Sequence, residues 1–248
     1  MAVKLHFLAD NQPKAMQALR ACIKRYNQTD MDKADAVIVL GGDGFMLKIL
    51  QALLNYQIPV FGLNLGHVGS LLNHYTPNNL PDRVASADRI SLTPLLVRAK
   101  PFCRNPGEAY VFNDASLTRQ TPQAARLSTI ITDEKDGKPV VMQETVFGDG
   151  VLVCTPSGSR GYNMSAGGKV LPSSAKEIGV KSICSRKNFN PILSDKAHIV
   201  VTPQEAVKRP VHLDLDGQTR INNIEIALIE SDPRKTQTLL LERKQNNR

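Results

Sequence analysis

Hydrophobic and polar positions follow two different periods in the first third of the chain. Short apolar runs of the kind found in buried strands cover residues 3–8, 36–40 and 58–63. After Pro13 the apolar residues stand three or four positions apart, as on one face of a helix, at Met16, Leu19, Ile23 and Tyr26. The same spacing predicts a second helix over residues 45–54. Strands that alternate with helices predict an α/β N-terminal domain over residues 1–92.

The pattern changes near residue 92, where apolar runs become shorter and turn-forming residues become frequent. Strands are predicted at residues 95–97, 109–112, 127–132, 140–146, 151–154, 198–201, 211–215 and 224–229. Together they predict a β-rich, antiparallel and sandwich-like C-terminal domain over residues 93–235. We expect residues 236–248 to form a last strand, at 238–241, and a tail, and this part to return to the N-terminal domain.

Turn and loop signals divide the second domain. Residues 172–196 are polar and carry few periodic apolar residues, so we expect a mobile loop there. Asp136-Gly137 and Asp216-Gly217-Gln218 are typical of hairpin turns.

Composition narrows the class of protein. The chain has 248 residues, of which 42% are hydrophobic, which is enough for a substantial core. Its apolar runs are far shorter than the roughly 20 residues of a membrane-spanning helix, and no signal peptide is evident, so we expect a cytoplasmic protein without a membrane partner. The four cysteines stand far apart and are expected to be reduced and structural. The formal charge of +8 is not accompanied by basic residues interleaved with aromatics, so no nucleic-acid partner is expected.

A glycine turn gives the first candidate site. Gly41, Gly42 and Gly44 follow the second apolar run and precede the second helix, an arrangement that presents backbone N–H groups to a phosphate. Asp43 lies among them and would repel a phosphate, so it has another purpose: it caps the helix, holds a cation, or takes a proton from an attacking hydroxyl. The motifs of ordinary P-loop and Rossmann sites are absent. Gly44 and Lys48 are also candidate substrate contacts.

A second candidate site follows the run at 151–154, in a loop dense in glycine and hydroxyl residues that extends to Gly168. Such a loop suits a sugar or a base, whereas a flexible Ser/Gly linker is the plainer alternative. Ser157 and Ser159 lack the spacing of a serine nucleophile. Asn113 and Asp114 add an amide and a carboxylate at a strand end, able to bind a purine and a ribose diol, or else to form an Asx turn.

Taken together, these motifs resemble the NAD kinase family. The resemblance rests on Gly-Gly-Asp-Gly, on Asn113 followed by an acid, on Gly-Asp-Gly leading to Thr-Pro-Ser-Gly-Ser and Tyr-x-x-Ser-Ala-Gly-Gly, and on the late Asp-Gly-Gln. It spans most of the chain in the family's order. It implies an α/β domain joined to a β-rich domain, NAD bound between them, and a homodimer or homotetramer.

The resemblance also implies roles for residues. Asp43 would be the base for the adenosine 2′-hydroxyl, and the glycine turn would hold the phosphate donor, ATP or polyphosphate, with Mg²⁺ or another divalent cation. Asn113 and Ser157 would bind adenine and Asp114 a ribose. Further substrate-binding residues would be Asp149, Arg160, Gly161, Tyr162, Ser165 and Gln218, while metal ligands are not assigned.

The chain departs from the family pattern at several positions. Arg160 and Gly161 stand where a Thr-Ala pair is usual, and Asp114 is shorter than the usual Glu. Other departures are Ser70, Phe147 and the pair Lys169-Val170. A guanidinium at 160 in a nucleotide cleft can bind a phosphate or fill the substrate's space.

The leading hypothesis is a kinase that transfers the γ-phosphate of ATP to the 2′-hydroxyl of the adenosine ribose of NAD, giving NADP. One alternative is a kinase of the same fold that acts on a lipid or sugar hydroxyl. Another is a non-catalytic NAD(P) sensor that retains the binding residues.

Overall fold

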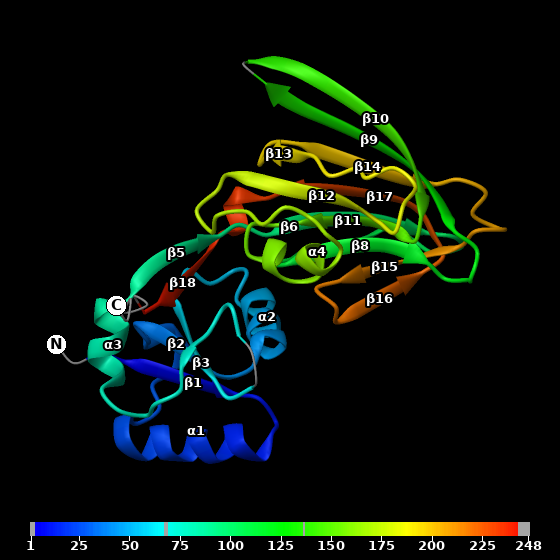
Figure 1. Ribbon diagram of the computed structural model, residues 1–248. Coiled ribbons are helices and arrows are strands. Elements are labelled where there is room, and N and C mark those ends of the chain that lie inside the picture. Colours follow the sequence, from blue (N-terminus) through cyan, green and yellow to red (C-terminus); the bar gives the residue numbers. More distant parts are fainter. Residues whose placement is uncertain (1–2, 67–68, 136, 243–248) are drawn as a thin grey trace. The chain divides into compact units, whose positions relative to one another are not determined.

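The computed structural model describes residues 3–66, 69–135 and 137–242, and the chain divides into two compact units (Figure 1). The first unit comprises Met1–Leu92 together with Lys235–Arg248, and the second comprises Thr93–Arg234. An α/β N-terminal region and an antiparallel, β-rich C-terminal region confirm the predicted fold class.

The first unit is built on one six-stranded sheet, with strand order β1-β2-β3-β18-β5 and β4 paired to β3. Its strands are β1 (Leu5–Ala9), β2 (Ala36–Gly41), β3 (Val60–Asn64), β4 (Asn73–His74), β5 (Asp88–Leu92) and β18 (Gln237–Leu241). The first three pair in parallel, as alternating strands and helices require. Strand β18, more than 140 residues further along the chain, pairs in parallel with β3 and antiparallel with β5.

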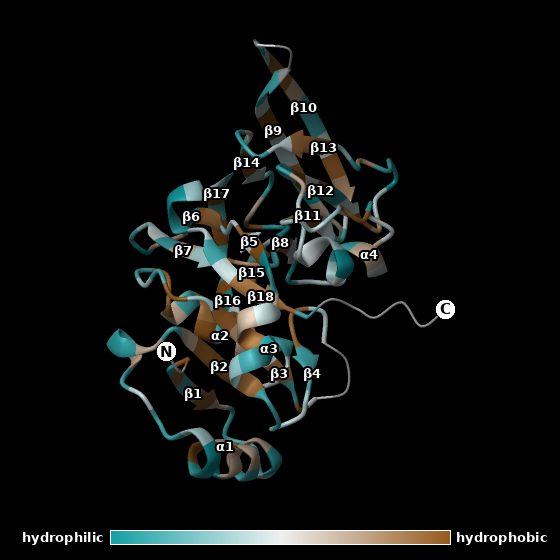
Figure 2. Ribbon diagram, turned by 90° about the vertical axis from the view of Figure 1, so that its left-hand side faces the viewer, coloured by the Kyte–Doolittle hydropathy of each residue, from teal (hydrophilic) through white to brown (hydrophobic). Residues whose placement is uncertain are grey.

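Helices accompany this sheet, and the sequence pattern predicted the first two of them. They are α1 (Pro13–Tyr26), α2 (Asp43–Ala52) and α3 (Leu80–Ser86), with short 3-10 turns at Met31–Lys33 and Pro233–Lys235. Helix α1 begins at Pro13 as predicted, but its most buried residues are the small Ala15, Ala18 and Cys22. The larger Leu19 and Ile23 flank that row and pack against the core. Figure 2 shows the strands β2 and β3 in the hydrophobic colour and α1 in mixed colours, which matches strands buried on both faces and a helix buried on one.

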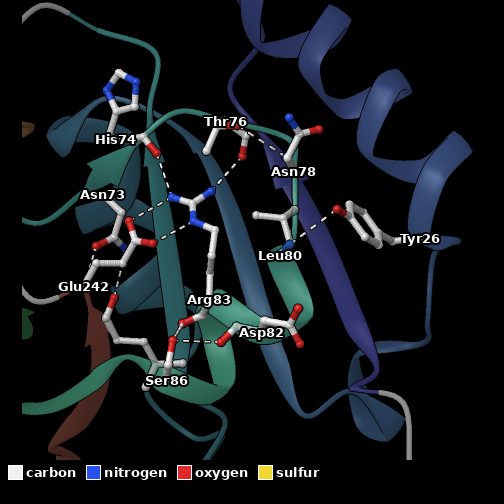
Figure 3. A network of polar contacts seen from close by, with 11 residues as sticks. Tyr26, Asn73, His74, Thr76, Asn78, Leu80, Asp82, Arg83, Ser86 and Glu242 are labelled. Carbon is white, nitrogen blue, oxygen red and sulfur yellow. Dashed lines mark hydrogen bonds and ion pairs between the residues drawn. The ribbon is translucent and has the colours of Figure 1, made fainter.

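A polar network fastens the end of β18 to the first unit (Figure 3). The Arg83 guanidinium donates to both carboxylate oxygens of Glu242, at 2.7 and 2.8 Å, and to the carbonyl oxygens of His74 and Thr76. Its Cζ also lies 5.4 Å from the centroid of the Phe61 ring. The buried Asn73 side chain donates to the Leu240 carbonyl and accepts from the Glu242 amide. Because this network has no local sequence signal, the pairing of β18 depends on tertiary contacts.

The second unit contains two six-stranded, predominantly antiparallel sheets. The first, in order β10-β9-β14-β17-β6-β7, consists of β10 (Lys138–Gly148), β9 (Ala125–Lys135), β14 (His198–Pro203), β17 (Ile224–Ser231), β6 (Leu95–Pro101) and β7 (Gly107–Val111). The second, in order β13-β12-β11-β8-β15-β16, consists of β13 (Ile192–Ser194), β12 (Glu177–Ile183), β11 (Gly150–Cys154), β8 (Asp114–Arg119), β15 (Val211–Leu215) and β16 (Thr219–Asn222). One hydrophobic cluster takes residues from both sheets, such as Leu127 and Ile199 from the first and Leu117 and Val151 from the second. This is the core of a β-sandwich.

The prediction of a mobile loop over residues 172–196 is wrong. That segment contains β12 and β13, and β12 is buried at every position except its first. A strand buried on both faces has no alternation, and here Gly179, Lys181 and Ser182 also interrupt the apolar run, so the pattern was lost. Strand β8 and helix α3 were likewise not predicted.

The predicted hairpin at Asp216-Gly217-Gln218 is confirmed, because β15 and β16 pair up to Leu215 and Thr219 on either side of it. For the other predicted turn, β9 and β10 pair up to Lys135 and Lys138. Asp136 itself lies outside the described residues.

Candidate functional site

The glycine turn of the first unit connects a buried strand to a helix. Strand β2 ends at Gly41, Gly42 is the N-cap residue, and α2 begins at Asp43. The Gly42 carbonyl accepts hydrogen bonds from the Phe45 and Met46 amides, both at 3.0 Å. A Cβ at Gly41 would lie 2.9 Å from the Phe45 ring, so packing excludes a side chain there. At Gly42 and Gly44 a Cβ would meet nothing within 4 Å, so packing within the chain does not explain these two glycines.

The Asp43 carboxylate is held by another segment of the same unit. Oδ2 accepts from the Ser70 amide at 2.8 Å and from the Ser70 hydroxyl at 3.1 Å, and Oδ1 accepts from the Leu71 amide at 3.2 Å. The helix-cap interpretation is wrong, because Gly42 is the N-cap residue and Asp43 binds residues 70 and 71. These three hydrogen bonds fix the orientation of the carboxylate. The exposed Lys48 lies on the same helix, one turn further along.

A cavity of about 390 Å³ lies in the first unit where β3 and β4 end. Asn64, Gly66 and His74 are among the residues that line it, with Lys14 from α1. A Cβ at Gly66 would lie 3.6 Å from the Gly42 Cα, so the cavity lining reaches the glycine turn. In parallel sheets ligands bind beyond the carboxyl ends of the strands, and the sequence analysis did not single out these lining residues.

In the second unit, the backbone of residues 112–114 is hydrogen-bonded on both sides. The Asp216 carboxylate accepts from the amides of Phe112, Asn113 and Asp114, at 2.9, 2.8 and 3.1 Å. On the other side, the Phe112 carbonyl accepts from the Thr155 hydroxyl at 2.6 Å and from the Ser157 hydroxyl at 2.8 Å. The Asn113 carbonyl accepts from the Thr155 amide at 2.9 Å.

Within this segment the two predicted ligand-binding side chains differ in their surroundings. Asn113 lies between β7 and β8, and its Oδ1 is buried without a hydrogen-bond partner among the described residues. Asp114 is the first residue of β8 and pairs with Cys154 of β11, so the Asx-turn alternative is wrong for it. Burial, and then the charges of Asp216 and Asp214, raise the pKa of Asp114 from 3.8 to about 7.

The loop after β11 is ordered, which makes the flexible-linker alternative wrong. The Thr155 hydroxyl accepts from the Gly158 amide at 3.1 Å, and Ser159 is fully buried, donating to the Pro156 carbonyl and accepting from the Leu171 amide. A Cβ at Gly158 would lie 2.0 Å from the Asn113 carbonyl oxygen, so only glycine permits this approach. Both serine hydroxyls of the loop donate to backbone carbonyls, which does not suit a nucleophile.

A second cavity, of about 630 Å³, lies in the second unit and includes two of the remaining predicted residues in its lining. Asp149 and Tyr162 line it. Arg119, which the sequence analysis missed, also lines it and donates from Nε to Asp149 at 2.6 Å and from Nη1 to the Thr121 carbonyl. Burial raises the pKa of Tyr162 although the residue is 44% exposed. Arg160, Gly161 and Ser165 are exposed. The backbone N–H of Gln218 donates to the Leu215 carbonyl.

Four residues of these sites carried no signal strong enough to find them from the sequence. Ser70 was noted only as a departure from a family pattern, and Asp216 only as a turn residue and as part of the late Asp-Gly-Gln motif. Thr155 and Arg119 belong to strands and loops whose partners are far away along the chain: Thr155 binds Phe112, 43 positions away, and Arg119 binds Asp149, 30 positions away. Their roles became visible only in the folded arrangement.

Residues 3–66, 69–135 and 137–242 contain no group of three or more His, Cys, Asp or Glu side chains placed to hold a metal ion. Within the same residues no helix is long and apolar enough to cross a membrane.

Comparison with known proteins identifies the family. The model of the ATP-NAD kinase N-terminal domain matches residues 2–86, and that of the ATP-NAD kinase C-terminal domain matches residues 122–235. The chain belongs to the NAD kinase family. It is 37% identical over 242 residues to the NAD kinase of Cereibacter sphaeroides, covering 96% of this chain and 92% of the relative. It is 34% identical over 243 residues to that of Hyphomonas neptunium, covering 97% and 92%.

Solved structures share the fold of this NAD kinase family member. Yeast NADH kinase complexed with NADH has a TM-score of 0.80 at 20% identity, covering 98% of this chain and 84% of the other. An NAD kinase from Archaeoglobus fulgidus in complex with ATP has a TM-score of 0.70 at 22% identity, covering 98% and 94%. At these identities the likeness supports the fold, while the family membership rests on the sequence matches.

Proposed function

We propose that the protein is an NAD kinase, which transfers the γ-phosphate of ATP to the 2′-hydroxyl of the adenosine ribose of NAD and releases NADP and ADP. The observation that carries the proposal is the Asp43 carboxylate, oriented by the Ser70 and Leu71 amides within a glycine turn at the start of α2. Membership of the NAD kinase family supports the choice of substrates.

In the proposed reaction Asp43 accepts the proton of the ribose 2′-hydroxyl while that oxygen attacks the γ-phosphorus. The bond between the γ-phosphorus and the β–γ bridging oxygen breaks, and the leaving oxygen stays with ADP. Phosphoryl transfer needs little beyond in-line positioning and charge stabilisation, so a fixed carboxylate and a turn rich in backbone donors suffice on the protein side.

Phosphates of ATP are assigned to Gly41, Gly42 and Gly44. Lys48 is an exposed cation on the same helix and can offset phosphate charge. A Cβ would meet nothing within 4 Å at Gly42 or Gly44, which leaves the backbone of the turn accessible to a phosphate.

Mg²⁺ is expected to enter with ATP. Mg²⁺ usually takes most of its ligands from phosphate oxygens and water. The described residues contain no cluster of three or more metal-binding side chains. The glycine turn would hold the phosphates that hold the ion, and the ion would offset their negative charge when bound.

The nucleoside of NAD is assigned to residues of the second unit. The Asn113 amide oxygen has no partner among the described residues and is available to accept from the adenine amino group. The Ser157 hydroxyl donates to the Phe112 carbonyl, so towards adenine it can act only as an acceptor. Asp114 is assigned to a ribose diol, and the cavity lined by Asp149 and Tyr162 to the nicotinamide half.

Other features stay predictions. They are polyphosphate as an alternative donor, a homodimer or homotetramer, a cytoplasmic location, and the part that Arg160, Gly161, Ser165 and Gln218 take in binding.

The proposal is tested by following NADP formation from ATP, Mg²⁺ and NAD in a coupled assay, with calorimetric titration of NAD alongside. Asp43→Asn is expected to lower turnover roughly a hundredfold to ten-thousandfold, the usual worth of general-base catalysis, and to leave NAD affinity within a few-fold. Ser70→Ala is the matched control, since it removes one donor to Asp43 and keeps the carboxylate and the Ser70 amide. Its turnover is expected to fall less than about tenfold.

Each contrary outcome points elsewhere. Unchanged turnover in Asp43→Asn would remove this residue from the mechanism. Tight NAD binding without NADP formation by the unaltered protein would favour the sensor, and ATP consumption with diacylglycerol in place of NAD would favour a lipid kinase.

A further inference from the structure

One side chain, that of Asp216, accepts hydrogen bonds from three consecutive backbone amides of the predicted nucleoside-binding segment. Oδ2 of Asp216 accepts from the Phe112 amide, and Oδ1 accepts from the Asn113 and Asp114 amides. Asp216 is only 8% exposed, so these bonds are shielded from water. A carboxylate enclosed by successive amides is a strong arrangement, since each bond has an ionised acceptor.

Asp216 also donates a hydrogen bond back to the segment that its carboxylate binds. The Asp216 amide donates to the Asp114 carbonyl at 2.9 Å. Asp216 has φ = 51°, a left-handed conformation that Asp tolerates, at the start of the hairpin turn between β15 and β16. The turn therefore presents both a carboxylate and an amide to residues about 100 positions earlier in the chain.

The opposite side of the segment is fixed by the loop after β11. Thr155 and Ser157 hydroxyls donate to the Phe112 carbonyl, and the Thr155 amide donates to the Asn113 carbonyl. Each backbone N–H and C=O group of residues 112–114 is thus hydrogen-bonded either to Asp216 or to the loop after β11. The backbone has little freedom, so the side chains of Asn113 and Asp114 start from defined positions.

The charge that strengthens these hydrogen bonds also acts on Asp114. This negative charge of Asp216 acts unfavourably on the buried Asp114 carboxylate, and it is the largest electrostatic cause, after burial itself, of the raised pKa of Asp114. Placing a second carboxylate beside a buried one costs stability, and such local conflicts are typical of functional positions.

We propose that Asp216 is a positioning residue for dinucleotide binding: its carboxylate holds the backbone of residues 112–114 so that Asn113 and Asp114 face the nucleoside. The inference rests on the proposed function, in which Asn113 and Asp114 bind the adenosine end of NAD. Asp216 itself need not touch the substrate.

The charged and titratable groups around Asp114 come from three further elements. Asp214 on β15 adds a second negative charge, although it is paired with Arg220 at 2.7 Å and with His212 at 3.1 Å. Cys154 on β11 has a pKa raised to about 12, chiefly by burial, so its thiol is neutral near pH 7. Tyr162, the first residue of the short helix α4 (Tyr162–Ser165), has a raised pKa and is neutral there as well. Asp216 and Asp214 are therefore the charges that act on Asp114 near neutral pH.

The experiment measures NAD affinity by calorimetry between pH 5.5 and pH 9 for the unaltered protein, for Asp216→Asn and for Asp214→Asn. In the unaltered protein affinity is expected to fall as the pH drops through about 7, because a protonated Asp114 accepts fewer hydrogen bonds from a ribose diol. Asp216→Asn keeps the size of the side chain and loses its charge and one acceptor. Its NAD affinity is expected to be about ten- to hundredfold weaker at pH 8, with the fall in affinity moved to lower pH.

Asp214→Asn is the matched control. It also removes a negative charge that acts on Asp114, but Asp214 makes no bond to the amides of residues 112–114 in the described structure. Asp214 also lines the second cavity, so Asp214→Asn is expected to move the pH profile in the same direction and to weaken NAD binding at pH 8 by less than Asp216→Asn does. Equal affinities at pH 8 for Asp216→Asn and Asp214→Asn would overturn the positioning role, and an unmoved pH profile in Asp216→Asn would overturn the action of its charge.

A measurement on the unaltered protein guards against a variant that fails to fold. Hydrogen exchange of the amides of residues 112–114 is expected to be slow before NAD is added, because Asp216 already binds them. Fast exchange that slows only with NAD would contradict a preformed clamp. Absence of NADP formation in the unaltered protein would instead sink the proposed function, so the two failures are distinguishable.

Discussion

The buried Asp114 carboxylate gives a prediction about stability that does not depend on any ligand. The residue is 8% exposed, and its pKa is raised from 3.8 to about 7 by burial and by the charges of Asp216 and Asp214. Replacing it by the nearly isosteric asparagine removes both the titration and the charge. We therefore expect the free energies of unfolding of the protein and of Asp114→Asn to depend differently on pH.

The sign and size follow from proton binding. With a raised pKa, the folded state binds the proton more tightly than the unfolded state, so this group lowers stability as the pH rises from 3.8 to about 7. The slope is about 1.36 kcal/mol per pH unit over that window. Between pH 5 and pH 8 the unaltered protein should lose about 2–3 kcal/mol relative to Asp114→Asn. A comparison across pH cancels any constant offset from the new amide.

Unfolding in urea is measured at pH 5 and pH 8. Pulsed hydrogen exchange of peptides from residues 93–234 serves as the readout, because Asp114 belongs to that unit. Circular dichroism of the same samples checks that both proteins are folded, since the chain has no Trp for fluorescence. Equal pH dependence in the two proteins would show that the carboxylate is ionised at pH 5 in the folded state, and would refute the reasoning. The same variant should bind NAD more weakly, which is the expected exchange of stability for function at a binding site.

Four further substitutions test the polar network, the packing of the loop after β11 and the glycine turn. Arg83→Met should lower the free energy of unfolding of the first unit by about 2–4 kcal/mol, because it leaves Glu242 and two carbonyls without their donor. Glu242→Gln should lower it by no more than about 1–2 kcal/mol. Urea denaturation measured on peptides of β18 distinguishes the two variants, and equal losses would contradict the network's geometry. Gly158→Ala should destabilise the second unit by about 3 kcal/mol or more and weaken NAD binding, since its Cβ would lie 2.0 Å from the Asn113 carbonyl oxygen. Gly44→Ala has open space and should change stability by less than about 1 kcal/mol while raising the KM for ATP at least about tenfold; an unchanged KM would show that no phosphate approaches this residue.

Periodicity along the chain predicted the main architecture, because the spacing of apolar residues within a segment indicates whether one face or both faces are buried. The runs at residues 3–8, 36–40 and 58–63 correspond to β1, β2 and β3, and the spacing after Pro13 corresponds to α1. The change to short β-like runs indicated the antiparallel second region. Where a strand is buried on both faces and contains Gly179 and Lys181, as in β12, no period remains and the prediction failed.

For the candidate site, the sequence supplied residue types and local frames. A glycine turn between a strand and a helix is a local feature, so Asp43 and its neighbours could be proposed as a site from four consecutive residues. Asn113, Asp114 and the loop after β11 were likewise proposed from their residue types, and the family resemblance added a role for each. The roles of these residues stay predictions that the experiments above address.

By itself the sequence determined which segments form strands and helices, and which chemical groups stand at their ends. Tertiary structure alone decided what those groups face: Ser70 for Asp43, Thr155 for Phe112, and a turn about 100 residues away for the amides of residues 112–114. The physical reason is range. Secondary structure depends on neighbours a few positions apart, whereas the orientation of a side chain and the pKa of a buried carboxylate depend on groups that only folding brings within hydrogen-bonding distance.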